Sequence, residues 1–399
     1  MLLIGIRCII RKEAKMSKKI KCLVWDLDNT LWDGILLEDG NVSLKEGMCE
    51  ILEELDRRGI LLSIASKNDR EDTLKKLRDL GVEDYFLYPQ IGWGNKPDAI
   101  KEIASALNIN IDTFAFIDDQ PSEREEVAFV LPQVMTVDAA QYKLLLDMEG
   151  FIPKYITKDS AMRRRMYQAD LQRKQAEGGF KGSSEQFLST LGMELTVAPV
   201  AEGDLERVEE LTVRTNQLNS TGVTYSFEEL EGFISSPDHI FLIADLEDKY
   251  GSYGKIGLVL LEETKDTIWI RLLLMSCRVM TRGIGSALLV HIIRLAGGKG
   301  KRLAADFIDT GRNRVMYITY KLMGFEESEE EHAAGVEMSG NYIISSARQD
   351  ESGDNDRDTD KSILEYKGSP DKEYPPYLKI YFDNGMHRRA AGLACDKPC

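Results

Sequence analysis

The chain has 399 residues, of which 43% are hydrophobic and 30% are charged, and its net charge is −16. This length leaves room for two or three domains, and this composition is that of a globular protein with enough apolar residues for a core. The acidic balance argues against nucleic acid or an anionic membrane as the main partner, since both attract basic surfaces, and leaves a small ligand or another protein open.

Cysteine and histidine are few and scattered. The six Cys include no CxxC pair and the four His are far apart, so neither a zinc site nor a disulfide framework is expected, and a cytoplasmic location is predicted. The apolar start is broken by Arg7, is too short to span a bilayer, and lacks the cationic start and cleavage site of a secretory signal. Residues 1–17 are interpreted as a non-native or disordered extension, with Met16 as a more natural start.

Between residues 18 and 150, apolar strand-like runs alternate with amphipathic helical runs. The expected strands span 20–27, 60–66, 85–89 and 113–119. The expected helices between them span 44–59, 70–81 and 96–108. Such alternation predicts an α/β domain with a Rossmann-type parallel sheet, and ligands bind at the carboxyl ends of its strands, where Asp26, Ser66 and Asp118 are placed.

A charged helical linker is expected at 151–185, with its helix at 161–179. The domain after it, 186–330, mixes hairpin-like strands with helices and is predicted to be α+β. Its expected elements span 204–219, 240–248, 255–263, 267–280, 287–296, 302–308 and 312–325. The rest is interpreted as an acidic flexible segment, a closing strand and a disordered tail, at 331–374, 375–383 and 384–399.

The most informative stretch is "KCLVWDLDNTLWDG" at 21–34, where Asp26 and Asp28 follow an apolar strand and point to the same side. Such a pair alone also occurs in turns, helix caps and calcium loops. Three further elements follow, each after its own strand: Ser66 in "SIASKN", Lys96 in "GWGNKPD", and Asp118 with Asp119 in "FIDDQP". Together they supply a nucleophilic carboxylate, a carboxylate for proton transfer, groups that hold phosphate oxygens, and ligands for Mg²⁺.

These elements resemble the four motifs of the haloacid dehalogenase-like (HAD) phosphotransferases. The resemblance implies that Asp26 is the nucleophile, which forms an aspartyl-phosphate, and that Asp28 is the general acid and base. It implies an Mg²⁺ site made of Asp26, Asp28 through its carbonyl, Asp118 and, in support, Asp119. The residues expected to bind phosphate are Thr30, Ser66, Lys67, Asn68 and Lys96.

The spacing of the motifs leaves no room for a cap domain. Ser66 follows Asp26 by 40 residues, and Lys96 follows Ser66 by 30. An uncapped site is open, so a bulky substrate such as a group carried on a protein could reach it. Exclusion of water would then need another domain or a partner.

A second pattern, "RVMTRGIGSALL", puts a Gly-rich loop between a strand and a helix start, where backbone N–H groups can bind an anion such as a pyrophosphate. Asn313 then precedes an aromatic helix that ends in Gly-Phe. The pair resembles the GNAT acetyltransferase fold, although Met280 stands where Gln or Arg is usual. The resemblance implies a groove of the pantetheine or coenzyme A type, formed by Arg278, Arg282, Gly283, Gly285 and Asn313. A structural turn without a ligand is the alternative.

Together the two patterns resemble the FkbH-like proteins, in which a HAD subfamily IIIC domain precedes a GNAT-like domain. "YPQIGWGNKP", "FIDDQPSEREEVAF", "RTNQLNSTG", "MSCRVMTRG" and "PPYLKIY" add to the likeness, which covers roughly residues 18–326. The resemblance implies dephosphorylation of 1,3-bisphosphoglycerate and transfer of its glyceryl group to an acyl carrier protein in polyketide biosynthesis. It also implies Mg²⁺ and the phosphopantetheine arm of the carrier protein as cofactors.

A cysteine thiol is expected to relay the acyl group. Cys277, beside the Gly-rich loop at the end of an expected strand, is the preferred candidate, and a buried strand cysteine is the alternative. Cys22 lies four residues before Asp26, about 13 Å along an extended strand, and ranks below it. Cys49 lies on a helix and has no special feature.

Three other features leave two interpretations open. Trp32 and Trp93 either line the mouth of the site or pack as aromatic side chains. Residues 214–222 either receive a carrier arm or cap a helix and turn the chain. Arg163–Arg165 and Arg173 either face an acidic carrier protein or form a solvated helix face.

The motifs predict an Mg²⁺-dependent phosphatase, and the resemblance to FkbH-like proteins implies that it is also a glyceryl transferase. A HAD phosphatase acting alone on a small phosphate ester is the main alternative, and it would release phosphate without a carrier protein. A docking module with vestigial chemistry is disfavoured by the complete motif set, and an acetyltransferase that uses acetyl-CoA is disfavoured by Met280.

Overall fold

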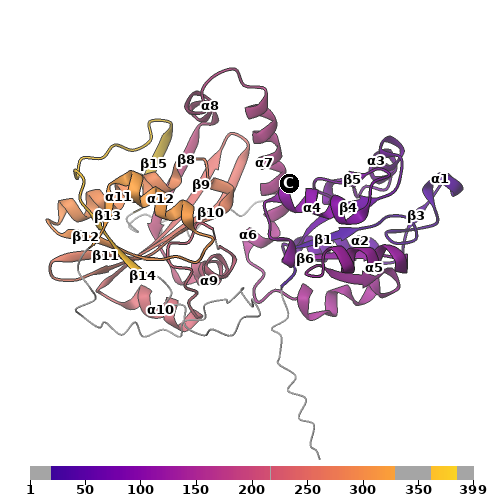
Figure 1. Ribbon diagram of the computed structural model, residues 1–399, viewed down its shortest axis with the longest axis horizontal. Helices are drawn as coiled ribbons and strands as arrows, with labels where there is room; N and C mark the ends of the chain where they lie inside the picture. Colours follow the sequence, from indigo (N-terminus) through magenta and orange to yellow (C-terminus); the bar gives the residue numbers. More distant parts are fainter. Residues whose placement is uncertain (1–18, 216, 329–360, 384–399) are drawn as a thin grey trace, which may run out of the picture. The chain divides into compact units, whose positions relative to one another are not determined.

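The computed structural model (Figure 1) describes residues 19–215, 217–328 and 361–383. They form two compact units, of which the first ends at Tyr167 and the second begins at Gln168. The helix expected at 161–179 is present as α7 (Arg163–Gly178) and crosses this division. Among the helices of the described ranges, none has the length together with the apolar character that a bilayer crossing requires.

The first unit is built on a five-stranded sheet in the order β5-β4-β1-β6-β7, with all neighbouring pairs parallel. Its strands are β1 (Cys22–Trp25), β4 (Leu61–Ser66), β5 (Gln90–Ile91), β6 (Phe114–Asp118) and β7 (Met135–Asp138). The main helices between them are α2 (Met48–Arg57), α3 (Arg70–Asp79), α4 (Lys96–Leu107) and α5 (Pro121–Val130). The predicted α/β fold with a parallel sheet is confirmed.

Burial follows from the sequence pattern of each element. All four residues of β1 are buried, as expected of an apolar run in a sheet covered on both faces. Helix α2 buries one face, made of Met48, Ile51, Leu52 and Leu55. Each buried Leu or Ile contributes roughly 2 kcal/mol by removing apolar surface from water. The Asn95 side chain accepts a hydrogen bond from Asp98 N (2.9 Å) and caps α4, which fixes Lys96 at the start of the helix.

The strand expected at 85–89 is not formed as predicted. Tyr85, the first residue of the expected strand, belongs to the 3₁₀ helix η1 (Glu83–Tyr85). Phe86 makes only an isolated bridge with Leu62. Regular pairing resumes in β5. Tyr88 has a φ of 50°, which is not an extended conformation, and Pro89 has no N–H to donate to a ladder; together they account for the break.

The interval after Asp26 holds a small hairpin and no cap domain, in agreement with the prediction of an uncapped unit. Its elements are β2 (Trp32–Asp33), α1 (Leu36–Asp39) and β3 (Ser43–Leu44), with β2 and β3 antiparallel. The remaining short elements of this unit are η2 (Ile111–Thr113), η3 (Ala139–Asp147), η4 (Glu149–Phe151) and α6 (Lys158–Ala161).

Within its described residues, the second unit contains an eight-stranded sheet in the order β13-β14-β12-β11-β10-β9-β8-β15. Its strands are β8 (Met193–Pro199), β9 (His239–Asp248), β10 (Gly251–Glu263), β11 (Thr267–Met275), β12 (Arg302–Ile308), β13 (Phe325–Glu327), β14 (Lys361–Tyr366) and β15 (Leu378–Phe382). Its helices are α8 (Ser184–Leu191), η5 (Glu202–Asp204), α9 (Leu205–Arg214), α10 (Phe227–Ser235), η6 (Cys277–Val279), α11 (Ile284–Gly298) and α12 (Arg314–Met323). The pairs β11–β12 and β8–β15 are parallel and the others antiparallel.

Helices cover both faces of this sheet (Figure 1). Alternation along β10 sends Leu258 and Leu260 into a core shared with α9 and α10. It sends Val259 and Leu261 into a core shared with α8, α11 and α12. The prediction of a second domain built from strands and helices is confirmed.

Two expected elements of this unit are shorter than predicted. The strand expected at 267–280 ends at Met275 and is followed by η6, and the helix expected at 204–219 ends at Arg214. Both ends adjoin residues 218–220, whose backbone hydrogen-bonds to the last residues of β11. A chain that leaves the helix to pair with a strand cannot continue as helix, which accounts for the difference.

The C-terminal part contains more regular structure than predicted. β14 lies within 331–374, expected to be flexible, and pairs with β12 and β13 because Leu364 enters the core. Within 375–383, expected to be a closing strand, β15 pairs in parallel with β8. The predicted segments 1–17 and 384–399 lie outside the described residues, as does the part 331–360 of the segment predicted at 331–374.

Candidate active site

Four polar side chains from separate motifs meet at the carboxyl edge of the first unit's sheet. Asp26 follows β1, Ser66 ends β4, Lys96 begins α4 and Asp118 ends β6. Ser66 Oγ donates to Asp26 Oδ1 (3.0 Å), and Lys96 Nζ donates to the same oxygen (2.5 Å) and to Asp118 Oδ2 (3.2 Å). All four are buried. Parallel strands bring their carboxyl ends to one edge, and that topology gathers residues far apart in sequence.

The Lys96 ammonium compensates the charge of this cluster. It also donates to Ala65 O (2.8 Å) and lies 3.1 Å from Glu123 Oε2. Burial by itself would lower the pKa of Lys96, but the negative charges of Asp26, Asp118 and Glu123 outweigh it, so the pKa is raised. Lys96 is therefore a fixed cation, suited to hold the oxygens of a phosphoryl group.

The pKa values of the two aspartates beside Lys96, Asp26 and Asp118, are both raised. Burial raises the pKa of Asp26, against the opposing charge of Lys96 and the hydrogen bonds from Lys96 and Ser66. Burial and then the charge of Asp26 raise the pKa of Asp118 to about 7. Two carboxylates this close in a buried site repel each other, and a divalent cation between them would relieve that repulsion.

The chemistry of the donor set fits Mg²⁺. Asp26, Asp118 and Asp119 each offer an oxygen within 4.8 Å of the others. Asp119 Oδ1 is buried and has no hydrogen-bond partner, while the Asp119 amide donates to Thr30 Oγ1 (3.0 Å). A hard divalent cation prefers such oxygens, and a buried carboxylate oxygen without a partner is costly unless a cation binds it. The carboxylate of Asp28 is not part of this cluster, and ligation through its carbonyl stays a prediction.

Asp28 has its own set of donors. Trp32 Nε1 (2.8 Å) and Leu36 N (3.0 Å) donate to Oδ1, and Asn68 Nδ2 (2.9 Å) donates to Oδ2. Trp32 is fully buried in the hairpin, so the packing interpretation holds for it and it also serves the site. Three donors hold the Asp28 carboxylate in one orientation two residues from Asp26, which suits a group that transfers a proton.

The other predicted phosphate-binding residues lie around this cluster. Asn68 also donates to Ser66 Oγ (3.3 Å). Lys67 Nζ donates to Glu123 Oε1 (2.6 Å) and its side chain is 43% exposed. Thr30 is buried and bonded to the Asp119 amide, so its hydroxyl orients that loop. Direct contact of these three residues with phosphate stays a prediction.

Glu123 is absent from the sequence prediction, although it is buried and ion-paired with both Lys67 and Lys96. Burial alone would raise the pKa of Glu123, but the charge of Lys96 and the contacts with Lys67 lower it. Pro121 opens α5, so Glu123 occupies the first turn. Because the helix dipole favours acidic residues there, the sequence gives no sign that this one is functional.

Trp93 differs from Trp32 in being 70% exposed, so aromatic packing does not account for it. It lies in the loop between β5 and α4. The amide of Gly92, one residue earlier, donates to Ser66 O (3.0 Å), which ties this loop to the site. Whether Trp93 contacts a substrate stays a prediction.

In the second unit, the Gly-rich loop is packed by the chain's own side chains. Gly283 has φ of 73° and precedes α11. A Cβ at Gly283 would overlap the Tyr377 hydroxyl, and one at Gly285 would lie 3.0 Å from Cε of Met275. Both glycines are thus explained by close packing, and ligand binding at this loop stays a prediction.

Asn313 is fully buried and bonded to backbone groups. Its Nδ2 donates to Asn219 O (2.9 Å) and Ile308 O (2.8 Å), and its Oδ1 accepts from Thr310 N (3.1 Å). Asn219 Oδ1 in turn accepts from Thr221 N (3.1 Å) and closes a turn. The polar run around Asn219 therefore turns the chain, and Asn313 holds that turn against β12.

The remaining arginines of the predicted groove are engaged within the second unit. Arg278 Nη2 donates to Tyr253 O (2.9 Å). Arg282 is 4% exposed, and its Nη1 lies 3.5 Å from Glu177 Oε2. Its Nε has no hydrogen-bond partner. Binding of a ligand by these two side chains stays a prediction.

The arginines of α7 fit neither sequence interpretation as a group. Arg163 is buried and donates to a backbone carbonyl of the first unit (2.7 Å). Arg173 is also buried and makes two hydrogen bonds of 2.8 Å with the Asp248 carboxylate. Arg164 is ion-paired within the first unit, and Arg165 is exposed. Most of this charge is therefore used inside the protein.

Three of the cysteines lie in the described residues. Cys22 is buried, and burial strongly raises the pKa of its thiol, so little reactive thiolate forms at neutral pH. Cys49 is exposed on α2. Cys277 is partly exposed in η6, so the alternative of a buried strand cysteine is wrong. Its role as an acyl relay stays a prediction.

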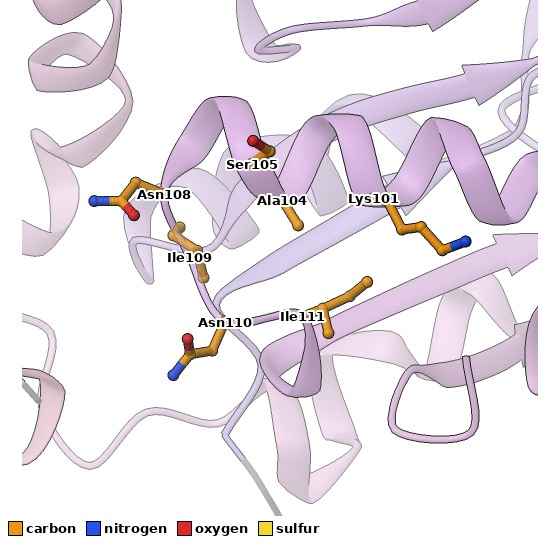
Figure 2. A pocket seen from close by; sticks show the side chains of 7 residues that line it. All are labelled: Lys101, Ala104, Ser105, Asn108, Ile109, Asn110 and Ile111. Atoms are coloured by element: carbon orange, nitrogen blue, oxygen red, sulfur yellow. The ribbon is translucent and has the colours of Figure 1, made fainter. Parts of the chain in front are cut away.

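A hollow of about 330 Å³ lies elsewhere in the first unit (Figure 2). Its lining comes from the last turns of α4 and the loop into η2: Lys101, Ala104, Ser105, Asn108, Ile109, Asn110 and Ile111. This end of α4 is about 15 Å along the helix axis from Lys96. The lining contains no carboxylate or thiol, so the chemistry is assigned to the Asp26 cluster.

Residues 12–126 match the family model described as haloacid dehalogenase-like hydrolase. The matched range contains every residue of the Asp26 cluster, including Glu123. None of the curated proteins matches the chain. The match and the site together support a hydrolase-type enzyme in the first unit, which is the coarser part of the predicted resemblance.

Solved structures show similarity to each unit. One is the N-terminal part of a Bacteroides fragilis protein that contains a phosphatase domain complexed with Mg, with 31% identity over 31% of this chain and 38% of that chain, and a TM-score of 0.29. Others are the ribosomal-protein-S18-alanine N-acetyltransferase of Escherichia coli (13% identity, 45% and 99% covered, TM-score 0.30) and an N-acetyltransferase of Thermoplasma acidophilum in complex with coenzyme A (17%, 44% and 99%, 0.28). These TM-scores are low, so the fold of each unit rests on its own strand order.

Proposed function

We propose that the chain is an FkbH-like, Mg²⁺-dependent enzyme that dephosphorylates 1,3-bisphosphoglycerate, or a similar phospho-acyl substrate, and transfers the glyceryl group to an acyl carrier protein. The observation that carries the phosphoryl-transfer part is the buried cluster of Asp26, Ser66, Lys96 and Asp118, with Asp28 held beside it. The acyl-transfer part is supported by the motifs of the second unit. The first unit has no cap domain between Asp26 and Ser66, which agrees with a substrate presented by another protein.

In the phosphoryl-transfer step, an Asp26 oxygen attacks phosphorus and the bond from phosphorus to the leaving oxygen breaks. Asp28 gives its proton to that oxygen. Water then attacks the aspartyl-phosphate and gives a proton to Asp28, which releases inorganic phosphate and restores both residues. Lys96 and Ser66 hold the phosphoryl oxygens. A Mg²⁺ held by Asp26, Asp118 and Asp119 would neutralise the charge that develops on them.

In the acyl-transfer step, a thiolate attacks the C1 carbonyl carbon of 1,3-bisphosphoglycerate, the bond from that carbon to the phosphate oxygen breaks, and the C1 phosphate leaves as inorganic phosphate. The product is a thioester of the enzyme. The phosphopantetheine thiol of the carrier protein then attacks that thioester, and the enzyme thiol is released. Cys277 is the candidate thiol because it is partly exposed beside the Gly-rich loop, whereas Cys22 is buried.

A HAD phosphatase that acts alone on a small phosphate ester is the second candidate. It is favoured by the state of the second unit, where Tyr377 covers Gly283 and Asn313 is bonded to backbone groups. An open groove for a pantetheine arm would leave such groups accessible. This candidate needs only the Asp26 cluster.

Intact-protein mass spectrometry distinguishes the two candidates. The full chain is incubated with 1,3-bisphosphoglycerate, Mg²⁺ and phosphopantetheinylated acyl carrier protein, beside Asp26→Asn and Cys277→Ala. We expect a glyceryl adduct on the carrier protein that is free of phosphate with the wild type. Asp26→Asn should leave the adduct phosphorylated or absent, and Cys277→Ala should prevent it. Phosphate release with a carrier protein that stays unmodified would instead favour the small-ester phosphatase.

A further inference from the structure

Helix α12 presents an apolar stripe to solvent. Val315, Ile318 and Leu322 are 40%, 45% and 79% exposed, and their spacing of three and four residues puts them on one side of the helix. The opposite side buries Met316 and Tyr320 in the core. Met316 and Tyr320 therefore hold the helix against the core, and the exposed stripe is not needed for this packing.

The border of this stripe is basic, although the chain as a whole carries a net charge of −16. Arg314 and Lys321 are seven residues apart and so lie on the same border of the helix. Arg312 is exposed just before the helix, and α12 itself contains no acidic residue. The nearby Glu327 accepts a hydrogen bond from the Tyr317 hydroxyl (2.5 Å). An apolar stripe with a cationic border fits an acidic surface that carries apolar side chains.

The other border of the stripe adjoins the Gly-rich loop. Cγ2 of Thr319 would lie 3.5 Å from a Cβ built at Gly285, in the first turn of α11. In the same loop Met280 is 39% exposed, three residues after the partly exposed Cys277. A protein bound on α12 would therefore stand beside the Gly-rich loop, which follows the Cys277 segment in the chain.

We propose that this face of α12, defined by Val315, Ile318 and Leu322 with Arg314 and Lys321 on its border, is the docking surface for an acidic partner protein, the carrier protein of the proposed reaction. The inference rests on the proposed function for the identity of the partner. The apolar stripe supplies the buried centre of the interface. The arginine and lysine steer the acidic partner and fix its orientation.

The test measures binding and transfer with the full chain and phosphopantetheinylated acyl carrier protein as the probe. Leu322→Ser and Arg314→Glu are compared with Val213→Ser, a matched control on α9 that is 58% exposed but lies among glutamates. We expect Kd to rise about tenfold in each α12 variant and to stay unchanged in the control. Wild-type binding should weaken with added salt. Phosphate release from p-nitrophenyl phosphate should be equal in all four proteins.

At a limiting concentration of carrier protein, transfer should fall about tenfold in the α12 variants, and it should recover at saturation. If the wild type acylates the carrier protein and the α12 variants do so equally well, the docking proposal is overturned while the proposed function stands. A wild type that neither binds nor acylates the carrier protein overturns both. A wild-type dimer in sedimentation that Leu322→Ser converts to monomer would overturn the proposal in favour of a second copy of the chain.

Discussion

Both units place polar residues where a strand ends and a helix begins, but they use them differently. In the first unit, Ser66 and Lys96 are bonded to carboxylates from other strands, and charge is concentrated at one point. In the second, Asn313 is bonded to backbone groups and Gly283 is covered by Tyr377. The difference teaches that a polar residue at a strand end is a candidate for catalysis when its partners are charged side chains, and for architecture when they are backbone groups.

The strongest way to break this comparison is to remove the cation from the first site. Lys96→Met would leave Asp26, Asp118 and Glu123 together without a counter-charge. We expect phosphate release from p-nitrophenyl phosphate with Mg²⁺ to fall by at least about 10³-fold. We also expect the free energy of unfolding in EDTA to fall by roughly 3 kcal/mol, measured by urea denaturation.

The matched control for this variant is Lys101→Met on the same helix. The Lys101 side chain is 50% exposed and pairs with Asp98 at the surface. Its replacement should leave both activity and stability unchanged within error. Retention of more than a tenth of wild-type activity by Lys96→Met would contradict the role assigned to Lys96.

The second unit gives the converse prediction. Asn313→Ala removes the side-chain amide that donates to two buried carbonyls and accepts from one backbone amide. These backbone groups would lose their partner, so we expect the free energy of unfolding to fall by roughly 3 kcal/mol. Phosphate release should be unchanged under conditions where the protein stays folded. Ser189→Ala, which removes one exposed hydroxyl from α8, is the control and should have no effect. Unchanged stability with lost acyl transfer would instead place Asn313 in a ligand groove.

A smaller effect is expected when the orientation of Asp28 is loosened. Trp32→Phe removes the indole donor to Asp28 Oδ1. We expect kcat for an alkyl phosphate, whose leaving oxygen needs a proton, to fall by about tenfold or more, and kcat for p-nitrophenyl phosphate to change little. Trp269→Phe, in β11 of the second unit, serves as the control. Equal losses on both substrates would show that Trp32 supports the fold and does not position the proton donor.

The smallest expected effect is in the pH dependence of stability without metal. The pKa of Asp118 is raised from 3.8 to about 7 in the folded chain. A carboxyl group with a raised pKa stabilises the fold below its unfolded pKa, and this contribution is lost as pH rises through the folded value. In EDTA, the Tm of the wild type should therefore fall between pH 5 and 8 by roughly 5 °C more than that of Asp118→Asn. Parallel pH curves for the two proteins would contradict this, and Mg²⁺ should abolish the difference.

Much of the first unit could be predicted because its information is local. The apolar runs of β1, β4 and β6 and the helices between them require a parallel sheet, and that topology alone brings Asp26, Ser66 and Asp118 together. Pro89 is also a local signal. It argues against a strand at 85–89, and the prediction of that strand does not take it into account. Glu123 could not be found in this way, because an acidic residue in a first helical turn is ordinary until its lysine partners are known.

The second unit was harder to predict because its pairings are distant in sequence. β14 pairs with β12, and Lys361 stands opposite Ile308. The local sequence of the acidic segment that contains β14 does not indicate that it pairs with β12. The end of β11 depends likewise on residues 218–220, which reach it from another part of the chain. In the second unit, the sequence predicts whether a segment is a strand or a helix, but it does not predict which strand pairs with which.

The strand order of the second unit also bears on the order of folding during synthesis. The first unit is complete once Tyr167 has left the ribosome, because all five strands of its sheet precede that residue. The second sheet has β15 at one edge, paired with β8, and β14 next to the other edge. Neither place can be filled until residues 361–366 and 378–382 have been translated. A nascent chain halted before β14 would expose the unpaired sides of β12 and β8. Unpaired strand edges of this kind can pair with other chains, so the incomplete second unit is the part of the nascent chain most open to aggregation.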